Sequence, residues 1–201
     1  MIAIVDYDAG NLKSVSKALD ALGQENIITG DAQQILAADK VILPGVGSFG
    51  DAMTQLKSRG LDQVLKQVAA EGKPLLGICL GLQVLFESSE ESPGVEGLGI
   101  LKGKVLRIPD AEGLKIPHVG WNSLHLQNNG RLFEGLKEDS YVYFVHSYYL
   151  KAEDPQIVKA VTEYGVSIDA SVESGNVFAC QFHPEKSSDV GAKILTNFAS
   201  I

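Results

Sequence analysis

Short apolar runs alternate with amphipathic segments along the first half of the chain. The runs are short enough to be buried strands, and they lie at residues 1–5, 26–28, 40–43 and 74–78. Between them, apolar side chains recur every three or four residues, as along one face of a helix, at Leu12, Val15, Ala18, Leu19 and Leu22 and again from Met53 through Val68. Strands that alternate with helices predict a parallel sheet covered on both faces.

Residue types mark the ends of the first helix. Asn11 stands just before the first helical pattern, where an Asn side chain can cap the N-terminus. Gly23 follows that pattern and is expected to end it. A further helix is expected in residues 80–87, directly after a strand.

The second half of the chain changes character. Its apolar and aromatic residues lie in closely spaced, strand-like segments, at residues 103–109, 118–126, 141–150, 157–164, 166–173 and 176–182. These segments predict antiparallel hairpins or extensions of the main sheet. A last helix is expected from about Ser188, burying Val190, Ile194, Leu195 and Phe198. The prediction for residues 1–201 is a single three-layer α/β domain, with a mainly parallel central sheet and antiparallel additions in the second half.

Composition narrows the classes of function. The 201 residues are 45% hydrophobic and carry a formal net charge of −8, which makes the chain a poor partner for nucleic acid or an anionic membrane surface. The N-terminus lacks the features of a signal peptide, and the apolar stretch at residues 75–82 is too short to cross a bilayer. Two cysteines far apart make no disulfide framework, and no zinc-binding spacing is present. We therefore expect a cytoplasmic protein without a metal.

A glycine-rich segment at residues 45–50, GVGSFG, follows the third candidate strand. It matches the G-x-G-x-x-G pattern of dinucleotide-binding loops, but that pattern normally follows the first strand, and here Pro44 separates the strand from the glycines. Two other interpretations remain open: a plain turn that uses glycine at positive φ, and a loop whose backbone N–H groups face a developing oxyanion. The last of these requires a nucleophile nearby.

Cys79 lies between Gly77 and Gly81, directly after an apolar run. Small residues on both sides of a nucleophile are needed in a strand–nucleophile–helix elbow, because larger side chains would clash with the neighbouring elements. At a helix N-terminus the dipole favours a thiolate, and the amide of Leu80 would face an acyl oxyanion. A packed, inert thiol is the alternative, and this segment alone does not separate the two.

Three of the four histidines lie in segments that indicate no catalytic role. His125 alternates with apolar residues and is expected to be structural. His118 and His146 lie in aromatic-rich strands, either as packing residues or on the rim of a site. Cys180, inside an apolar strand, is expected to be a core residue.

His183 differs because it ends an apolar strand and is followed by Pro184 and Glu185. Ligands bind at the carboxyl ends of strands in α/β sheets, so this histidine is well placed for a site. The proline stiffens the link to Glu185, whose carboxylate can hold the imidazole tautomer. Cys79, His183 and Glu185 therefore form a candidate catalytic triad.

These motifs resemble one known family, the class I (triad-type) glutamine amidotransferases. The pair GICLGLQ (77–83) and QFHPE (181–185) is specific, and PGVGSFG (44–50) matches the position of the family's oxyanion loop. Within the family, the chain resembles the glutaminase subunits of histidine biosynthesis, through DYDAGNLKSV, LPGVGSFGDAM, ICLGLQVLFESSEE, PHVGWN, YFVHSY and FHPEKSS. The resemblance runs from about residue 6 to 188, and no triad position is missing.

The resemblance implies a glutaminase that needs no cofactor. Cys79 would attack the carboxamide of glutamine, His183 would shuttle the proton, and Glu185 would orient His183. Further implied site residues are the oxyanion amides at Val46, Gly47 and Leu80, and the glutamine contacts at Gly47, Gln83, Ser147 and Tyr148. The glycines beside Val46 also suggest a peptide flip that turns an N–H toward the oxyanion or away from it.

The resemblance also implies a partner, because free ammonia is mostly unreactive ammonium at neutral pH and the family passes it through a closed channel. The partner here would be a (β/α)₈-barrel cyclase in a heterodimer, which makes imidazole glycerol phosphate and an aminoimidazole carboxamide ribotide. The matching interface positions are Asn11, Trp121, Tyr143 and Lys186. Core packing is the other interpretation of Trp121, and a solvated charge that of Lys186.

Three alternative functions remain open from the sequence. One is nucleotide binding through GVGSFG, which would be seen as binding of a dinucleotide cofactor. The glutaminase subunit of anthranilate or aminodeoxychorismate synthase would have the same triad and a different partner. A non-catalytic α/β binding module with a redox-sensitive Cys79 would form no glutamate at all.

Overall fold

The computed structural model describes residues 1–201, and five of its strands are mutually parallel. They are β1 (Ile2–Val5), β2 (Asn26–Thr29), β3 (Lys40–Leu43), β4 (Leu75–Ile78) and β12 (Val177–Cys180). Four more strands continue the sheet in antiparallel fashion: β7 (His118–Leu126), β8 (Ser140–His146), β10 (Val158–Glu163) and β11 (Ser167–Ser174). The resulting nine-stranded sheet has the order β2-β1-β3-β4-β12-β11-β10-β7-β8.

A second, small sheet packs beside the first. It consists of three strands in the order β5-β6-β9, namely β5 (Ser88–Ser89), β6 (Gly103–Arg107) and β9 (Tyr148–Ala152). The first half of the chain is thus parallel and the second half adds antiparallel strands, as the sequence predicted.

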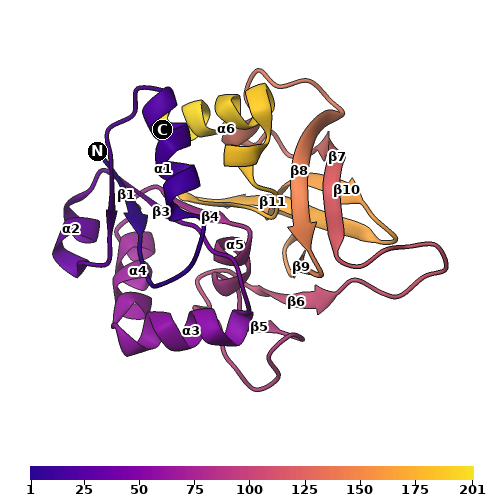
Figure 1. The fold of residues 1–201 in the computed structure, drawn as a ribbon, viewed down its shortest axis with the longest axis horizontal. Coiled ribbons are helices and arrows are strands. Elements are labelled where there is room, and N and C mark those ends of the chain that lie inside the picture. The colour runs from indigo at the N-terminus through magenta and orange to yellow at the C-terminus, as the bar shows by residue number, and fades with distance from the viewer.

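Helices cover both faces of the main sheet (Figure 1). One face carries α1 (Leu12–Ala21) and α6 (Ser188–Ser200). The other face carries α2 (Ala32–Ala37), α3 (Phe49–Ser58), α4 (Leu61–Ala70) and α5 (Leu80–Val84). Three short 3₁₀ turns complete the chain: η1 (Arg131–Phe133), η2 (Pro155–Ile157) and η3 (Pro184–Lys186).

Alternate side chains of each parallel strand enter two separate cores, because successive residues of a strand point to opposite faces. In β1, Ile2 and Ile4 pack with α1 and α6, whereas Ala3 and Val5 pack with the helices of the other face. All four are buried. Full burial of an Ile or Val side chain contributes about 1.5–3 kcal/mol, so the continuous apolar run of β1 stabilises both layers.

The structure corrects several predicted boundaries. The pattern from Met53 to Val68 is two helices, because Gly60 at φ +68° separates α3 from α4. The short α2 was not predicted, although Asp31 caps it by accepting a hydrogen bond from the N–H of Gln34. The predicted strand at residues 141–150 is split between the two sheets as β8 and β9. In α6, Val190 is half-buried at the edge of the core.

The carboxyl ends of four parallel strands meet at one edge of the sheet. β1 leads into residues 6–11, β3 into residues 44–48, β4 into Cys79, and β12 into residues 181–187. This is the edge at which open α/β sheets bind ligands. None of the helices combines the length and the hydropathy needed to cross a bilayer.

Candidate active site

Cys79 lies on the tight turn between β4 and α5. Its backbone has φ 55° and ψ −108°, in a region that residues other than glycine rarely adopt. The flanking glycines have no room for a side chain: a Cβ at Gly81 would overlap the carbonyl oxygen of Leu43, and one at Gly77 would lie 2.7 Å from the carbonyl oxygen of Gly81. Packing thus requires the small neighbours that the elbow interpretation expects.

His183 and Glu185 form a hydrogen-bonded pair at the end of β12. His183 Nδ1 lies 2.7 Å from Glu185 Oε1, and both side chains are fully buried. A carboxylate only accepts, so Nδ1 carries a proton in either form of the imidazole, and Nε2 remains for the nucleophile. The Ser187 hydroxyl donates to the His183 carbonyl oxygen at 2.6 Å and holds the turn.

The surroundings of His183 favour its protonated form. Burial by itself lowers the pKa of the imidazole, but the neighbouring Cys79 thiol and Glu185 carboxylate outweigh burial and raise that pKa to about 9. At neutral pH, His183 is therefore an imidazolium that can give its Nε2 proton to a leaving group. His183 Nε2 is buried without a hydrogen-bond partner. Catalytic hydrogen bonds are often absent or long without substrate and form only in the substrate complex.

Asn11 has a different role from the predicted side-chain cap. It occupies the N-cap position of α1 at φ 76°, but its side chain makes no capping hydrogen bond. Its amide nitrogen donates instead to Glu185 Oε1 at 2.5 Å and lies 3.5 Å from His183 Nδ1. This hydrogen bond fixes the Glu185 carboxylate against His183.

A cavity of about 290 Å³ opens in front of Cys79. Seven residues that the sequence predicted line it: Val46, Gly47, Cys79, Leu80, Gln83, Ser147 and Tyr148. They come from the loop after β3, the start of α5 and the junction of β8 with β9, which are far apart in the sequence. His183 and Glu185 are not part of the lining and are closed off from solvent.

The backbone amide of Leu80, a predicted oxyanion donor, is already engaged. It donates to the carbonyl oxygen of Gly45 over 3.4 Å. Gly47 has φ +107°, which glycine alone adopts readily, and a Cβ there would meet nothing within 4 Å. In this conformation of the loop, the Leu80 amide is directed at Gly45 through a long hydrogen bond.

Two buried glutamines connect the cavity to the nucleophile. Gln83 Nε2 donates to the Tyr148 carbonyl oxygen and to Gln181 Oε1, both at 3.1 Å. Gln181 Nε2 in turn lies 3.6 Å from Cys79 Sγ. Sequence reasoning missed Gln181. The signal that could have found it is the parallel register of β4 with β12, which, continued by one residue, places Gln181 opposite Cys79.

Glu91 is another lining residue that the sequence patterns did not indicate. Its Oε2 accepts a hydrogen bond at 2.8 Å from the N–H of Phe49, the first residue of α3. Glu91 thus anchors the end of the glycine-rich loop. It lies in a run of Glu and Ser residues, and only the approach of α3 distinguishes it from its neighbours.

His118 and His146 form a buried pair, and His146 also lines the cavity. His146 Nδ1 lies 2.9 Å from the Tyr148 carbonyl oxygen, so it is the protonated nitrogen. His118 Nδ1 then donates to His146 Nε2 at 3.1 Å. Burial lowers the pKa of His118 to about 4 and that of His146 to about 3, so both rings are neutral at neutral pH.

Exposed aromatic and apolar side chains gather on β7 and β8 beside the triad. Trp121 is 53% exposed, which excludes core packing, and its ring meets that of half-buried Tyr143 edge-on. Val119 and Tyr141 are exposed on the same strand pair. Lys186 is exposed in η3, directly after Glu185. Such a patch is typical of a protein-binding surface.

Two remaining expectations concern residues away from the cavity. Cys180 is fully buried, and burial raises the pKa of its thiol well above the usual value, which confirms a core position. His125 is exposed and lies 3.3 Å from Glu138 and 3.1 Å from Asp139. These three side chains are all open to solvent.

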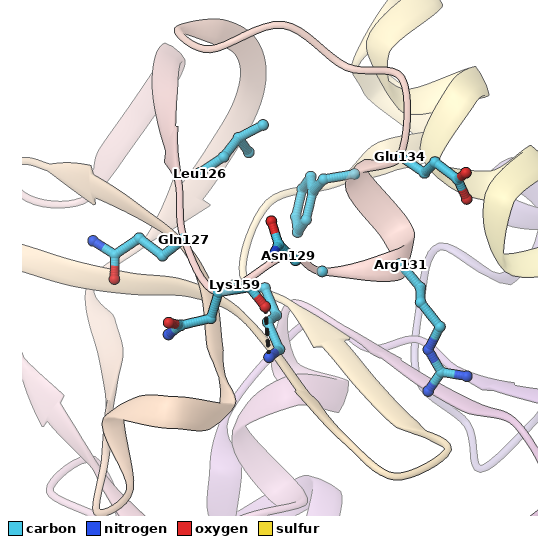
Figure 2. A pocket seen from close by; sticks show the side chains of 9 residues that line it. Leu126, Gln127, Asn129, Arg131, Glu134 and Lys159 are labelled. Atoms are coloured by element: carbon cyan, nitrogen blue, oxygen red, sulfur yellow. Dashed lines mark hydrogen bonds between the residues drawn. The ribbon is translucent and has the colours of Figure 1, made fainter.

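A hollow of about 410 Å³ lies over the turn that follows β7 (Figure 2). Its two basic side chains are already engaged. Arg131 binds Glu173, and Lys159 donates to two backbone carbonyl oxygens. Neither a cysteine nor a histidine lines it, so the cavity at Cys79 is the candidate active site.

Comparison with known families and proteins agrees with this geometry. The family model for "Glutamine amidotransferase class-I" matches residues 3–201. The "Imidazole glycerol phosphate synthase subunit HisH" of Bacillus cereus (strain G9842) is 51% identical over 201 residues, covering 100% of this chain and 95% of the relative. The protein of the same name from Moorella thermoacetica is 50% identical over 200 residues, covering 100% of this chain and 94% of the relative.

Solved structures confirm the α/β fold class. One described as "Crystal structure of glutamine amidotransferase" superposes with a TM-score of 0.78 at 21% identity, covering 100% of this chain and 99% of that chain. The "Structure of PurLQS from Thermotoga maritima" also gives a TM-score of 0.78, at 24% identity and with 99% and 97% coverage. At these identities the likeness speaks for the fold alone.

Proposed function

Because this chain belongs to the class-I glutamine amidotransferase family, we propose that it is the glutaminase subunit of an imidazole glycerol phosphate synthase. The observation that carries the proposal is the buried His183–Glu185 pair beside Cys79, at a cavity that also contains Gln83 and Tyr148. The chain hydrolyses glutamine to glutamate and supplies the ammonia to a cyclase partner in histidine biosynthesis. The identity of 51% over the full chain favours this partner over those of anthranilate or aminodeoxychorismate synthase.

The first half of the reaction forms a thioester. The Cys79 thiolate attacks the side-chain carbonyl carbon of glutamine, and the carbonyl oxygen becomes an oxyanion. His183 gives its Nε2 proton to the amide nitrogen, the C–N bond breaks, and ammonia leaves. Glu185, held by Asn11, keeps the imidazole oriented throughout.

The second half hydrolyses the thioester. Neutral His183 takes a proton from water as the water oxygen attacks the thioester carbonyl carbon. The C–S bond breaks, glutamate leaves, and the thiolate–imidazolium pair is restored. Gln83, with the backbone at Ser147 and Tyr148, lines the cavity and is proposed to hold the glutamine.

The oxyanion needs N–H donors from Leu80 and from the turn at Val46 and Gly47. The Leu80 amide is engaged with Gly45, so the isolated subunit is expected to be slow. Loss of one oxyanion donor costs about 3–4 kcal/mol, or roughly 10²–10³ in rate. A partner that shifts the loop at residues 45–47 would then switch the glutaminase on.

The partner is proposed to bind over the exposed aromatic patch and the triad turn. Trp121, Tyr143 and Lys186 lie there, and the backbone N–H of His183 donates to the Tyr143 carbonyl oxygen at 2.9 Å. Through Tyr143 and Lys186, contact with the partner reaches the triad directly. Asn11, which touches Glu185 and His183, is the second route.

Glutamate release from glutamine tests this proposal. The purified chain is assayed alone, then with the cyclase subunit, then with the cyclase and its nucleotide ligand. We expect slow release alone and strong stimulation in the complex. If the chain releases glutamate but an active cyclase does not stimulate it, the chain is the glutaminase of another amidotransferase. If no mixture releases glutamate, only the interpretation as a binding module remains.

The Cys79→Ser variant is the first control for that assay. A serine hydroxyl is a far weaker nucleophile than a thiolate, so glutamate formation should fall at least about 10³-fold. Circular dichroism and Tm should stay close to wild type, because serine fits the same turn. Residual activity near wild type would show that Cys79 is not the nucleophile.

A further inference from the structure

We propose that Gln181 is a positioning residue for the nucleophile: its side-chain N–H donates to the Cys79 thiolate and holds the sulfur in place. This role lies within the proposed glutaminase function and adds a residue outside the triad. Gln181 is fully buried, Cys79 is 7% exposed, and Gln181 Nε2 lies 3.6 Å from Cys79 Sγ. That distance suits a hydrogen bond to sulfur.

The direction of this hydrogen bond follows from a backbone carbonyl. The Tyr148 carbonyl oxygen can only accept, so the Gln83 atom 3.1 Å from it is the amide nitrogen. That same nitrogen lies 3.1 Å from the Gln181 side chain, which must therefore present its oxygen. The other end of the Gln181 amide is its nitrogen, and this end faces the sulfur. The Tyr148 carbonyl oxygen thus determines that the Gln181 side chain presents its N–H donor to Cys79.

The Tyr148 carbonyl oxygen is itself held from two sides. It accepts from Gln83 Nε2 and also lies 2.9 Å from His146 Nδ1, which donates to it. The series of hydrogen bonds from Tyr148 through Gln83 and Gln181 to Cys79 therefore begins at a carbonyl oxygen that is held in place. All its members are buried or half-buried, which makes these hydrogen bonds stronger than exposed ones.

A buried donor at this place interacts differently with the two forms of the sulfur. A thiol sulfur is a weak acceptor and a charged thiolate a strong one, so the Gln181 amide binds the attacking sulfur more tightly than the resting thiol. A purely structural requirement would be met at lower cost by an apolar side chain of similar size, since a buried amide must be hydrogen-bonded. Gln181 satisfies its amide between Gln83 and Cys79.

The test is the pH dependence of Cys79 alkylation by iodoacetamide, with the adduct located by mass spectrometry. Gln181→Met keeps the length of the side chain and removes the donor, so the midpoint should move up by about one pH unit. Gln181→Glu faces the sulfur with a carboxylate, so its midpoint should move further in the same direction. Ser171→Ala is the control, because it removes a different buried hydrogen bond, to the Ala179 carbonyl oxygen of β12. It should keep the wild-type midpoint.

A second variant covers the case in which both Gln181 substitutions fail to fold. Gln83→Leu removes the group that orients the Gln181 amide, so the alkylation midpoint should again move upward. For folded Gln181→Met, kcat for glutamine should fall more than KM rises. A midpoint unchanged in every folded variant of Gln181 or Gln83 would overturn the proposal.

Alkylation needs no glutaminase activity, so the two proposals fail separately. A wild-type chain that alkylates at Cys79 but makes no glutamate contradicts the proposed function and leaves the role of Gln181 measurable. A chain that makes glutamate with equal alkylation midpoints in wild type and Gln181→Met contradicts only the role of Gln181.

Discussion

At the scale of the residue, the triad depends on neighbours that carry no chemistry of their own. Asn11 donates to Glu185, and the Ser187 hydroxyl holds the His183 carbonyl oxygen. Burial alone would lower the pKa of His183, and the charges at Cys79 and Glu185 reverse that effect. The protonation state of the imidazole is therefore decided by two side chains, each of which can be tested.

Glu185→Gln should shift the alkaline limb of the pH–rate profile. The pKa of His183 is raised to about 9, in part by the Glu185 carboxylate, so neutralising that carboxylate lowers it. The imidazolium is then lost at lower pH, and kcat/KM for glutamine should begin to fall below pH 9. The measurement is kcat/KM between neutral and alkaline pH in the complex with the cyclase.

The matched control for that variant is Glu138→Gln. Glu138 also lies beside a histidine, 3.3 Å from His125 Nδ1, but on the surface and away from the cavity. Its alkaline limb should coincide with that of wild type. An unmoved limb in Glu185→Gln would show that Glu185 does not act on His183 in the working enzyme.

At the scale of the element, two backbone features shape the site. The turn between β4 and α5 holds Cys79 in a left-handed conformation, with no space for a Cβ at Gly77 or Gly81. The loop between β3 and α3 differs, because Gly47 has open space around it and only its φ of +107° demands glycine. Packing therefore requires glycine at the first feature, whereas backbone conformation requires it at the second.

Gly47→Ala therefore tests the conformation of the loop without a steric clash. A Cβ at this φ costs at least about 1 kcal/mol, which shifts the loop away from its present form. We expect altered regulation: the ratio of partner-stimulated to basal glutamate release should fall several-fold. The assay compares both rates in the variant and in wild type.

Gly94→Ala is the control for the loop variant. Gly94 also has a positive φ, of +83°, and open space around it, but it does not line the cavity. Its cost in stability should be similar and its stimulation ratio normal. If Gly47→Ala keeps the wild-type ratio, the loop has no part in the switch.

At the scale of the whole molecule, the fold brings together an active-site edge and an exposed aromatic surface. The parallel strands form the edge, and the antiparallel pair β7–β8 adds Trp121 and Tyr143 beside it. His118, buried between Phe144 and Tyr164, belongs to the same strand pair. The binding of a partner and the dependence of folding stability on pH therefore depend on how these strands pack together, and not on any single segment.

Lys186→Ala should weaken stimulation by the cyclase. Lys186 is exposed and follows Glu185 in η3, so its charge is available to a partner at the triad turn. The concentration of cyclase that gives half-maximal stimulation should rise several-fold, and more so at low salt. Lys193→Ala, an exposed lysine on α6, should leave that concentration unchanged. If Lys186→Ala and wild type respond equally to increasing cyclase, Lys186 does not contribute to binding of the partner.

The neutral histidine pair should make the protein less stable in mild acid. In the unfolded chain both histidines bind protons near pH 6.5, but in the fold burial lowers the pKa to about 4 for His118 and about 3 for His146. Between pH 6.5 and the lowered pKa values of the fold, the unfolded state thus binds more protons than the folded state. The free energy of unfolding therefore falls as the pH drops below about 6.5.

A comparison of thermal unfolding at neutral pH and at pH 5 checks this expectation. The loss of Tm on acidification should be smaller in His118→Gln than in wild type, because one of the two titrating rings is gone. His125→Gln, at an exposed histidine, should lose as much Tm as wild type. Parallel losses in all three proteins would contradict the role of the buried pair.

The sequence by itself determined the α/β class and most strands, and it singled out Cys79, His183 and Glu185 as the proposed nucleophile, base and acid. These features have local causes: apolar runs of strand length, glycines around Cys79, and a histidine at a strand end followed by Pro184 and Glu185. It was wrong about a side-chain cap at Asn11, missed α2 and Gln181, and left Trp121 open between core and surface.

Only the tertiary structure decided these cases, because each depends on contacts between segments distant in the chain. Asn11 donates to Glu185 across 174 positions, and Gln181 meets Cys79 across 102. The exposure of Trp121 depends on where the strand pair β7–β8 lies in the sheet. Local patterns specify which groups can react, and the packing of strand ends specifies which groups hold them.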